Sequence, residues 1–321
     1  MIGKRKVILV GTGFVGMSMA YSLLNQGNAS GVNELVLIDV LKDKAEGEAM
    51  DLCHGLPCSP SHMKIKSGDY SECKDADIVV ITAGLSQKPG QTRLELSTAN
   101  AKIMKDITEQ VVASGFNGIF LVASNPVDLM TKVVQEVSKF PTRKVIGSGT
   151  ALDTARLRFL VGEYLNVSNK NVHAYIMGEH GDSSFVPWDH AYVGCKKVQD
   201  ILKDAKKDLT DLDKIYVEVR DAAYEIIEKK KATYYGIGLG LTKIVKTILN
   251  NTNEILTVSA YLDGNYGHKD IYIGVPAIIN GKGVRELLEL ELNEAEQAKL
   301  DNSCKIIKEM REQSIDKIIN E

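Results

Sequence analysis

The first half of the chain alternates short, wholly apolar runs with longer stretches whose apolar residues recur at helical spacing. Wholly apolar runs are typical of strands that are buried on both faces of a parallel sheet. Strands of this kind are expected at 7–10, 34–39, 78–82, 118–123 and 144–146. Helices are expected from the glycine turn at 11–16 to about residue 25, and at 42–53, 93–113 and 127–137. The pattern predicts an α/β fold with a Rossmann-type doubly wound parallel sheet.

The second half has a different pattern. Its apolar runs indicate strands of a more antiparallel kind at 172–177, 185–193, 254–262, 271–279 and 284–290. The last two are joined by Asn280-Gly281, a strong hairpin signal. Long helices are expected at 210–230, 239–249 and 293–319. We therefore expect a doubly wound domain over 1–147 and an α+β domain over 148–321, packed as one body with a site between them.

Composition narrows the classes of partner. A formal net charge of −3 argues against binding of nucleic acid. The chain lacks the run of about 18 apolar residues that a membrane span needs, and its N-terminus leads into an apolar strand without a signal-peptide segment. Five scattered cysteines give neither a disulfide framework nor a zinc pattern. We expect a cytoplasmic protein that binds no nucleic acid, membrane or metal.

Three glycines follow the first strand and open a helix, in the sequence Gly11-Thr-Gly-Phe-Val-Gly16. In this context the first glycine permits a tight turn, the second lets a pyrophosphate approach the backbone, and the third allows close helix–strand packing. Asp39 ends the second strand, where its carboxylate can accept hydrogen bonds from ribose hydroxyls and would repel a 2′-phosphate. NAD is therefore the expected cofactor. The alternative is a glycine turn beside a solvated aspartate.

The segment Gly178-Glu-His-Gly-Asp182 contains a candidate proton donor, because the imidazole of His180 titrates near neutral pH. Asp153 could orient this ring and stabilise its charged form. Arg156 lies on the same helix face as Asp153, and its planar guanidinium suits bidentate binding of a carboxylate. The set indicates hydride transfer to a small carboxylic acid. The alternative is an ordinary helix salt bridge between Asp153 and Arg156, with an unrelated surface histidine.

Two further loops follow expected strands at the carboxyl edge of the sheet, where ligands of α/β proteins bind. The loop after 78–82 is rich in glycine and proline and ends in Arg93 at the start of a helix. The helix dipole disfavours a basic residue there. A flap that carries Arg93 to a substrate carbonyl would give the residue a functional reason. Asn125, followed by Pro126, ends another strand and can donate a hydrogen bond at the same edge.

With these residues the chain resembles the L-lactate/L-malate dehydrogenase superfamily, and in particular its lactate branch, over essentially the whole length. Six motifs occur in the family's order, at 11–16, Asp39, 87–93, 124–126, 152–156 and 178–182. The resemblance implies direct hydride transfer with NAD and without a metal. It also implies that His180 is the catalytic acid–base, that Asp153 orients its ring and that Arg156 binds the substrate carboxylate. By the same resemblance, Arg93 polarises the substrate carbonyl and Asn125 is a supporting hydrogen-bond donor.

The resemblance extends to contacts with substrate and cofactor. Substrate contacts are implied at Gln87, Arg93, Asn125, Arg156 and Thr233. Cofactor contacts are implied at Gly11, Gly13, Phe14, Val15, Gly16, Asp39, Thr82, Ala83, Gly84, Val122, Ser124 and Asn125. A malate enzyme of this kind has an arginine at the position of Gln87, which pairs with the second carboxylate of its substrate. Neutral Gln87 suits the methyl group of pyruvate instead, because an unpaired carboxylate in a dry pocket is costly. Interconversion of pyruvate and L-lactate is therefore expected.

Arg158 and His173 match positions at which bacterial members activated by fructose 1,6-bisphosphate carry an arginine and a histidine. In those members the two residues meet their symmetry mates across a subunit interface and form a positive pocket for two phosphates. The resemblance thus implies a homotetramer that responds to this effector. The alternative is a surface Arg158 paired with Glu163 or another acid, together with a structural His173.

Two rival functions stay open. One is another L-2-hydroxyacid dehydrogenase, acting on malate or on a branched-chain 2-hydroxy acid, since pocket volume cannot be measured from sequence. The other is a non-catalytic sensor that binds NAD. The second is opposed by the presence of His180, Asp153, Arg156 and Arg93 in one chain, because a retired site has no physical reason to keep all four.

Overall fold

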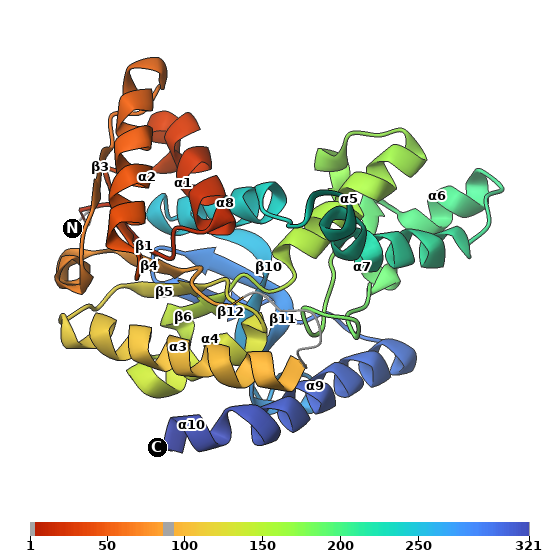
Figure 1. The fold of residues 1–321 in the computed structure, drawn as a ribbon. Helices are drawn as coiled ribbons and strands as arrows, with labels where there is room; N and C mark the ends of the chain where they lie inside the picture. The colour runs from red at the N-terminus through yellow and green to blue at the C-terminus, as the bar shows by residue number, and fades with distance from the viewer. Residues whose placement is uncertain (1–3, 86–92, 321) are drawn as a thin grey trace.

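The computed structural model describes residues 4–85 and 93–320 (Figure 1). In this part of the chain nine strands form one sheet, in the order β3-β2-β1-β4-β5-β6-β10-β11-β12. The first six pair in parallel and give the strand order of a doubly wound fold. They are β1 (Lys6–Val10), β2 (Glu34–Ile38), β3 (Lys64–Ser67), β4 (Ile78–Ile81), β5 (Ile119–Val122) and β6 (Val145–Gly147).

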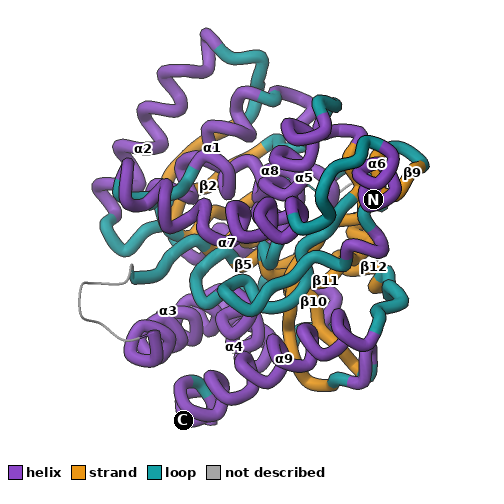
Figure 2. Tube along the Cα trace, turned by 90° about the vertical axis from the view of Figure 1, so that its right-hand side faces the viewer, coloured by secondary structure: helices purple, strands orange, loops and turns teal. Residues whose placement is uncertain are grey.

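Helices cover both faces of this sheet (Figure 2). One face carries α1 (Phe14–Asn25), α2 (Lys42–Gly55) and α8 (Tyr235–Leu249). The other face carries α3 (Arg93–Ala113), α4 (Val127–Ser138), α9 (Glu294–Ser314) and α10 (Asp316–Asn320). Every residue of β4 and β5 is buried between these layers, which explains why both strands are apolar throughout.

Three antiparallel strands from the second half of the chain extend the same sheet. They are β10 (Glu254–Asp263), β11 (Lys269–Asn280) and β12 (Gly283–Leu287). β10 joins β6 through the pairing of Ser259 with Gly147. The two halves are also joined by helix packing, since a Cβ added to Gly238 of α8 would lie only 2.7 Å from the Cβ of Ser18 in α1. The halves of the chain therefore share one sheet and one continuous core.

A smaller lobe lies beside the sheet, at the right of Figure 1. It contains α5 (Ala151–Leu165), α6 (Val198–Asp204) and α7 (Asp211–Lys230), together with the short antiparallel strands β7 (Val172–His173), β8 (Tyr192–Val193) and β9 (Lys196–Lys197). A second apolar cluster, which includes Leu157, Val172 and Leu212, holds these elements together. Because α5 follows β6 and α7 leads into α8, the lobe is connected to the sheet at the carboxyl edge of the parallel strands.

The predicted helices and the strands of the main sheet are largely confirmed, and α3 has the predicted bounds. The long strands predicted at 172–177 and 185–193 were wrong. Their backbone forms two-residue strands, a single bridge between Met177 and Phe185, and a 3-10 turn at Trp188–His190. Pro187 has no N–H to donate to a ladder, so a regular strand cannot continue past it. The helix predicted over 293–319 is interrupted at Ile315, where α9 ends before α10.

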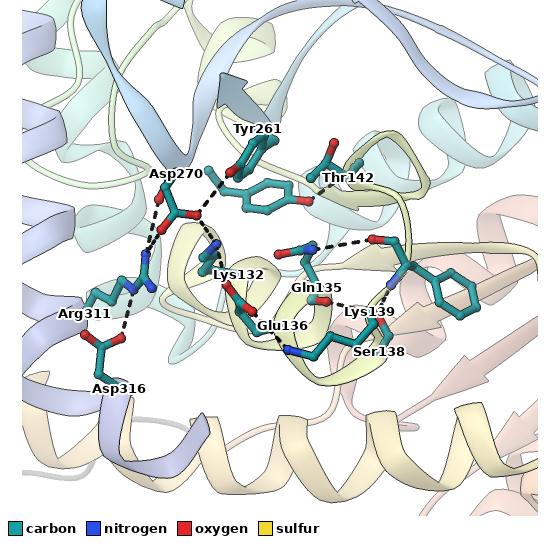
Figure 3. Close-up of polar contacts among 12 residues, drawn as sticks. Lys132, Gln135, Glu136, Ser138, Lys139, Thr142, Tyr261, Asp270, Arg311 and Asp316 are labelled. Carbon is teal, nitrogen blue, oxygen red and sulfur yellow. Dashed lines mark hydrogen bonds and ion pairs between the residues drawn. The ribbon is translucent and has the colours of Figure 1, made fainter. Parts of the chain in front are cut away.

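A cluster of ion pairs fixes α4 to β11 and to the C-terminal helices (Figure 3). The ammonium group of Lys132, whose side chain is 4% exposed, contacts the carboxylates of Glu136 and Asp270. Arg311 of α9 pairs with Asp270 at 2.6 Å and with Asp316 of α10 at 2.9 Å. α4 begins two residues after Asn125, so this cluster anchors an element that leads directly from the candidate site. Among the described residues, every helix is either too short or too polar to cross a lipid bilayer.

Candidate active site

The loops after β1 and β4 meet at the point where the strand order reverses. Gly11 has a φ of +101°, and a Cβ there would lie 2.5 Å from the backbone nitrogen of Ala83. A Cβ on Gly16 would lie 2.3 Å from the carbonyl oxygen of Gly11. The hydroxyl of Thr82 donates to this same carbonyl at 2.7 Å. Glycine is therefore required at both positions by backbone-to-backbone packing, as the sequence predicted for a tight turn and a close helix.

Space for a ligand opens at the N-terminus of α1. A Cβ on Gly13 would meet no described atom within 4 Å. Gly13 is the N-cap of α1 and has no side chain, so within the described part of the chain no cap side chain accepts from the first N–H groups of the helix. Phe14 and Val15 follow, and the Phe14 ring is 72% exposed and stacks on Tyr234 at 5.2 Å. An open approach to free helix N–H groups fits a pyrophosphate.

The carboxylate of Asp39 lies beside this opening, at the end of β2. It accepts hydrogen bonds from the N–H of Thr12 at 2.7 Å, from the Thr12 hydroxyl at 2.9 Å and from the N–H of Leu41 at 3.0 Å. Burial opposes ionisation, but the bonds from Leu41 and Thr12 together lower the pKa of Asp39 below its ordinary value. Asp39 therefore carries a fixed negative charge at the position where a ribose of a bound dinucleotide would lie.

One carboxylate holds both the candidate proton donor and the candidate substrate clamp. Oδ2 of Asp153 contacts Nδ1 of His180 at 2.7 Å, and Oδ1 accepts from Nη1 of Arg156 at 2.9 Å. The Asp153 side chain is 14% exposed. The helix salt bridge of the alternative interpretation is thus present, but its aspartate also binds the histidine. The pair leaves Nε2 of His180 as the ring nitrogen available to a substrate.

Charge near His180 favours the imidazolium. Burial disfavours the charged ring, but the charge and hydrogen bond of Asp153, with a smaller contribution from the charge of Asp128, raise the pKa of His180 to about 9. For Asp153, burial likewise opposes ionisation, and the charges and hydrogen bonds of His180 and Arg156 lower its pKa. A protonated donor and an ionised partner therefore coexist at neutral pH, which suits proton transfer to a carbonyl oxygen.

The loop that carries His180 is held by a residue that the sequence analysis did not identify. Asp128, in the first turn of α4, accepts the main-chain N–H of His180 at 3.0 Å and the hydroxyl of Ser259 at 2.6 Å. An acid in the first turn of a helix is ordinarily a favourable charge for the helix dipole, so its type and position gave no signal of a second role.

Asn100 links two loops of the site. Its side-chain oxygen accepts from the N–H of Leu85 at 2.8 Å, and its Nδ2 donates to the carbonyl of Asn125 at 2.8 Å. Asn125 itself is exposed and precedes a cis peptide bond to Pro126. Asn100 was also missed, because a single polar residue on a long helix has no distinguishing spacing.

These groups line a cavity of about 460 Å³ between the sheet edge and the smaller lobe. Expected site residues in its wall are Thr82, Gly84, Ser124, Asn125, Asp153, Arg156 and His180. Further wall residues come from α7, namely Val219, Arg220, Ala223, Tyr224 and Ile227. Three of these recur every four residues along one face of α7, a signal that is indistinguishable in sequence from an ordinary core face.

Other expected residues lie elsewhere. Val122 is fully buried within β5, and Thr233 lies in the connection between α7 and α8, outside the described cavity wall. Gln87 falls outside the described residues. Arg93 begins α3, but its side chain is not among those described.

Family models match both halves of the chain. Residues 5–147 match the NAD binding domain of lactate/malate dehydrogenase, and residues 150–318 match its alpha/beta C-terminal domain. The chain belongs to the lactate/malate dehydrogenase family. It is accordingly an NAD-dependent dehydrogenase, and the open N-terminus of α1 beside Asp39 fits the cofactor of that family.

Curated relatives in this family are similar over nearly the whole chain. L-lactate dehydrogenase 2 of Bacillus cereus is 58% identical over 308 residues, which are 96% of this chain and 97% of the relative. L-lactate dehydrogenase 1 of Bacillus anthracis is 56% identical with the same coverage.

Solved structures of the family have the same fold. MGS-M5, a lactate dehydrogenase from a deep-sea metagenome library of the Medee basin, aligns with a TM-score of 0.95 and 51% identity, covering 98% of this chain and 99% of the other. The minor L-lactate dehydrogenase of Enterococcus mundtii in its ligands-bound form aligns with a TM-score of 0.93 and 50% identity, covering 96% and 98%.

The two residues expected at a family effector site lie close together on the smaller lobe. Nε of Arg158 donates to the carbonyl of Ala174 at 3.1 Å, and its guanidinium lies 5.3 Å from the centre of the Tyr175 ring. His173, the neighbour of Ala174, is exposed on β7. Arg158 therefore donates a hydrogen bond to the residue that follows His173. The alternative interpretation expected a pairing with Glu163 or another acid.

Proposed function

We propose that this dehydrogenase interconverts pyruvate and L-lactate, as the last step of lactic fermentation. The observation that carries the proposal is the shared carboxylate of Asp153, which holds a proton donor and a carboxylate-binding arginine in one cavity. Its curated relatives are L-lactate dehydrogenases at 58% and 56% identity. Placement in the cytoplasm is part of the proposal and is supported by five cysteines that are all free thiols.

The chain's own groups divide the work of the reaction. Arg156 binds the substrate carboxylate, and its contact with Asp153 fixes the direction of the guanidinium. Asp153 holds Nδ1 of His180, so Nε2 donates its proton to the carbonyl oxygen. Arg93 polarises that carbonyl, and Asn125 supplies a further hydrogen bond. NADH, when bound, supplies the hydride that completes the alcohol at the former carbonyl carbon. In the reverse direction neutral His180 takes the proton back.

The residues at the switch point of the sheet would hold the cofactor. Gly13 and the main-chain N–H groups at Phe14 and Val15 would hold the pyrophosphate, and Asp39 would accept hydrogen bonds from the ribose hydroxyls. Gly11 and Gly16 let the loop pack closely against the neighbouring backbone, which leaves room for the pyrophosphate. The loops at 82–84 and 124–125, together with Val122 at the end of β5, would hold the nicotinamide half of the cofactor. By resemblance to the family, Gln87 and Thr233 would contact the methyl group of the substrate.

The first test is NADH oxidation by the purified protein with pyruvate, oxaloacetate and a branched-chain 2-keto acid. We expect pyruvate to be strongly preferred, because Gln87 offers no charge to a second carboxylate. Gln87→Arg supplies that charge and should shift preference toward oxaloacetate. If the unchanged protein prefers oxaloacetate, the proposed substrate pair of pyruvate and lactate is wrong, and the pair is oxaloacetate and malate. Preference for the branched-chain acid would assign another 2-hydroxy acid, and no turnover with any substrate would favour a sensor that binds NAD.

We further propose a homotetramer in which Arg158 and His173 bind fructose 1,6-bisphosphate with their symmetry mates. Support comes from the hydrogen bond that Arg158 of α5 donates to the carbonyl of Ala174, the residue after His173. Apolar side chains left exposed on α1 and α8, namely Phe14, Tyr21, Tyr235 and Leu239, give further support. Light scattering should show a tetramer, and the effector should lower the KM for pyruvate. Arg158→Gln should abolish this response without loss of basal turnover. A dimer that gives the same response would refute the assembly, and an unresponsive tetramer would refute the effector.

A further inference from the structure

Asp128 is a buried carboxylate directly behind the acid–base histidine. It is the second residue of α4, and the residue is 3% exposed. Its Oδ2 accepts the main-chain N–H of His180 at 3.0 Å, and its Oδ1 accepts the hydroxyl of Ser259 at 2.6 Å. Both carboxylate oxygens are thus engaged by groups from outside α4. The mechanism described above uses neither bond.

These bonds distinguish Asp128 from an ordinary helix cap. An acid in the first turn gains from the dipole of its own helix, but here the donors come from β10 and from the loop that follows Met177. Ser259 packs tightly against the backbone of two glycines. A Cβ added to Gly147 would lie 2.6 Å from the Cβ of Ser259, and a Cβ added to Gly149 would lie 2.2 Å from the nitrogen of Ser259. The carboxylate therefore connects His180 to a part of the sheet that has little room to move.

Among the charged groups around Asp128, His180 is the one whose positive charge can balance that of the carboxylate. Glu179 and His180 face it from the loop, and Cys304 from α9 is a 1% exposed thiol whose pKa is raised to about 12 by burial, so it is neutral. Asp153 and Arg156 of α5 lie on the other side of the imidazole and are paired with each other. A negative charge on Asp128 is therefore balanced chiefly by the imidazolium.

The ionisation of Asp128 is poised in the working range. Burial raises its pKa to about 6, against the opposing effects of the Ser259 hydrogen bond, the His180 N–H and the charge of His180. At pH 7 and above Asp128 is mainly ionised. Its charge is then one of the causes that raise the pKa of His180.

We propose that Asp128 is a positioning residue for proton transfer: its carboxylate fixes the main chain of His180, and its negative charge adds to that of Asp153 in stabilising the imidazolium. The inference rests on the proposed role of His180 as acid–base. It adds a second, more distant carboxylate to the His180–Asp153 pair. The two carboxylates act at different points, one on the ring and one on the main chain.

Asp128→Asn separates the charge from the hydrogen bonds. The amide oxygen can still accept the His180 N–H, and the amide nitrogen can donate to the Ser259 hydroxyl, which is able to accept. We expect the alkaline fall in the rate of pyruvate reduction to begin about one pH unit lower, with little change in KM. Relative to the unchanged protein, kcat should then be about twofold lower at pH 8 and nearly tenfold lower at pH 10. Asp128→Ala also removes the bond to the main chain and should lose about a further tenfold. Asp200→Asn, which removes a first-turn acid from α6, is the matched control.

A wild-type rate and pH profile in Asp128→Asn would overturn the role of the charge, and a lowered melting temperature without a kinetic change would reduce Asp128 to a structural residue. NMR titration of the His180 ring gives a readout that needs no turnover and no variant. In the unchanged protein its resonance should show a second inflection near pH 6, when Asp128 titrates. A single inflection would refute the coupling. If the unchanged protein does not reduce pyruvate, the proposed function fails, whereas this titration still tests Asp128.

Discussion

Replacement of Asp153 by asparagine tests the central geometry of the site. The carboxylate serves His180 with one oxygen and Arg156 with the other, at 2.7 and 2.9 Å. An asparagine has one oxygen and one NH₂ group, so either the imidazole or the guanidinium must face a donor instead of an acceptor. The substitution also removes the negative charge beside the imidazolium. Both effects weaken the protonated, correctly oriented ring that the proposed mechanism requires.

The size of the effect follows from the distance. A 2.7 Å contact between Nδ1 and Oδ2 places the two charge centres roughly 4 Å apart, where opposite charges attract by about 4 kcal/mol at an effective dielectric constant of 20. Water at the open cavity weakens this attraction, so we expect a loss of about 2–4 kcal/mol in stabilisation of the imidazolium. Since about 1.4 kcal/mol corresponds to a tenfold change in rate, kcat should fall by roughly 30- to 1000-fold.

The assay is steady-state oxidation of NADH with pyruvate from about pH 6 to 10, with the melting temperature as a check on folding. The control is Asp204→Asn, which breaks an exposed ion pair with Lys196 and should leave the kinetics unchanged. KM for pyruvate should also rise, because Arg156 loses its orienting partner. A folded Asp153→Asn variant with kcat within threefold of the unchanged protein, and with the same alkaline limb, would refute the reasoning.

Three further predictions concern pH, cofactor choice and stability. The raised pKa of His180, about 9, keeps the ring protonated at neutral pH, so pyruvate reduction should fall above about pH 9 while lactate oxidation rises; a fall centred near pH 6.5 would contradict this. Asp39→Asn should raise KM for NADH by roughly tenfold and increase the NADPH/NADH ratio of kcat/KM, and an unchanged ratio would count against the ribose contact. Lys132→Met should lower the free energy of unfolding in urea by about 3 kcal/mol, because it leaves Glu136 and Asp270 without their buried cation, whereas Lys4→Met at an exposed pair should change it little.

Local patterns were sufficient for the elements of the main sheet. Wholly apolar runs and helical spacing mark buried strands and amphipathic helices wherever packing on both faces is simple, as in β4, β5 and α3. β3 was not predicted, because Lys64–Ser67 is an edge strand of alternating exposure with lysines at two of its four positions. The joining of β10 to β6 was also absent from the prediction, since pairing between distant segments is not encoded in the periodicity of either one.

The candidate site was predictable where a spacing or a motif carried it. Asp153 and Arg156 are three residues apart on one helix, so their contact follows from helix geometry. Glycines 11 and 16 follow from the turn that a nucleotide needs. Asp128 and Asn100 escaped, because each acts through partners that only the tertiary fold brings near. Residues of this kind are recognised by what they contact, and no type or spacing distinguishes them beforehand.

The nine-stranded sheet that the two halves share has a consequence for the synthesis of this chain on the ribosome. When residues up to Gly147 have emerged, β6 has its inner edge paired with β5 and its outer edge bare. The bare edge is covered only when β10 has been synthesised and pairs with β6. The side of α1 that packs against α8 stays exposed until α8 has been synthesised. An open strand edge of apolar residues recruits other chains. We therefore expect the nascent N-terminal half to need chaperones, and a protein cut after residue 147 to aggregate rather than bind dinucleotide.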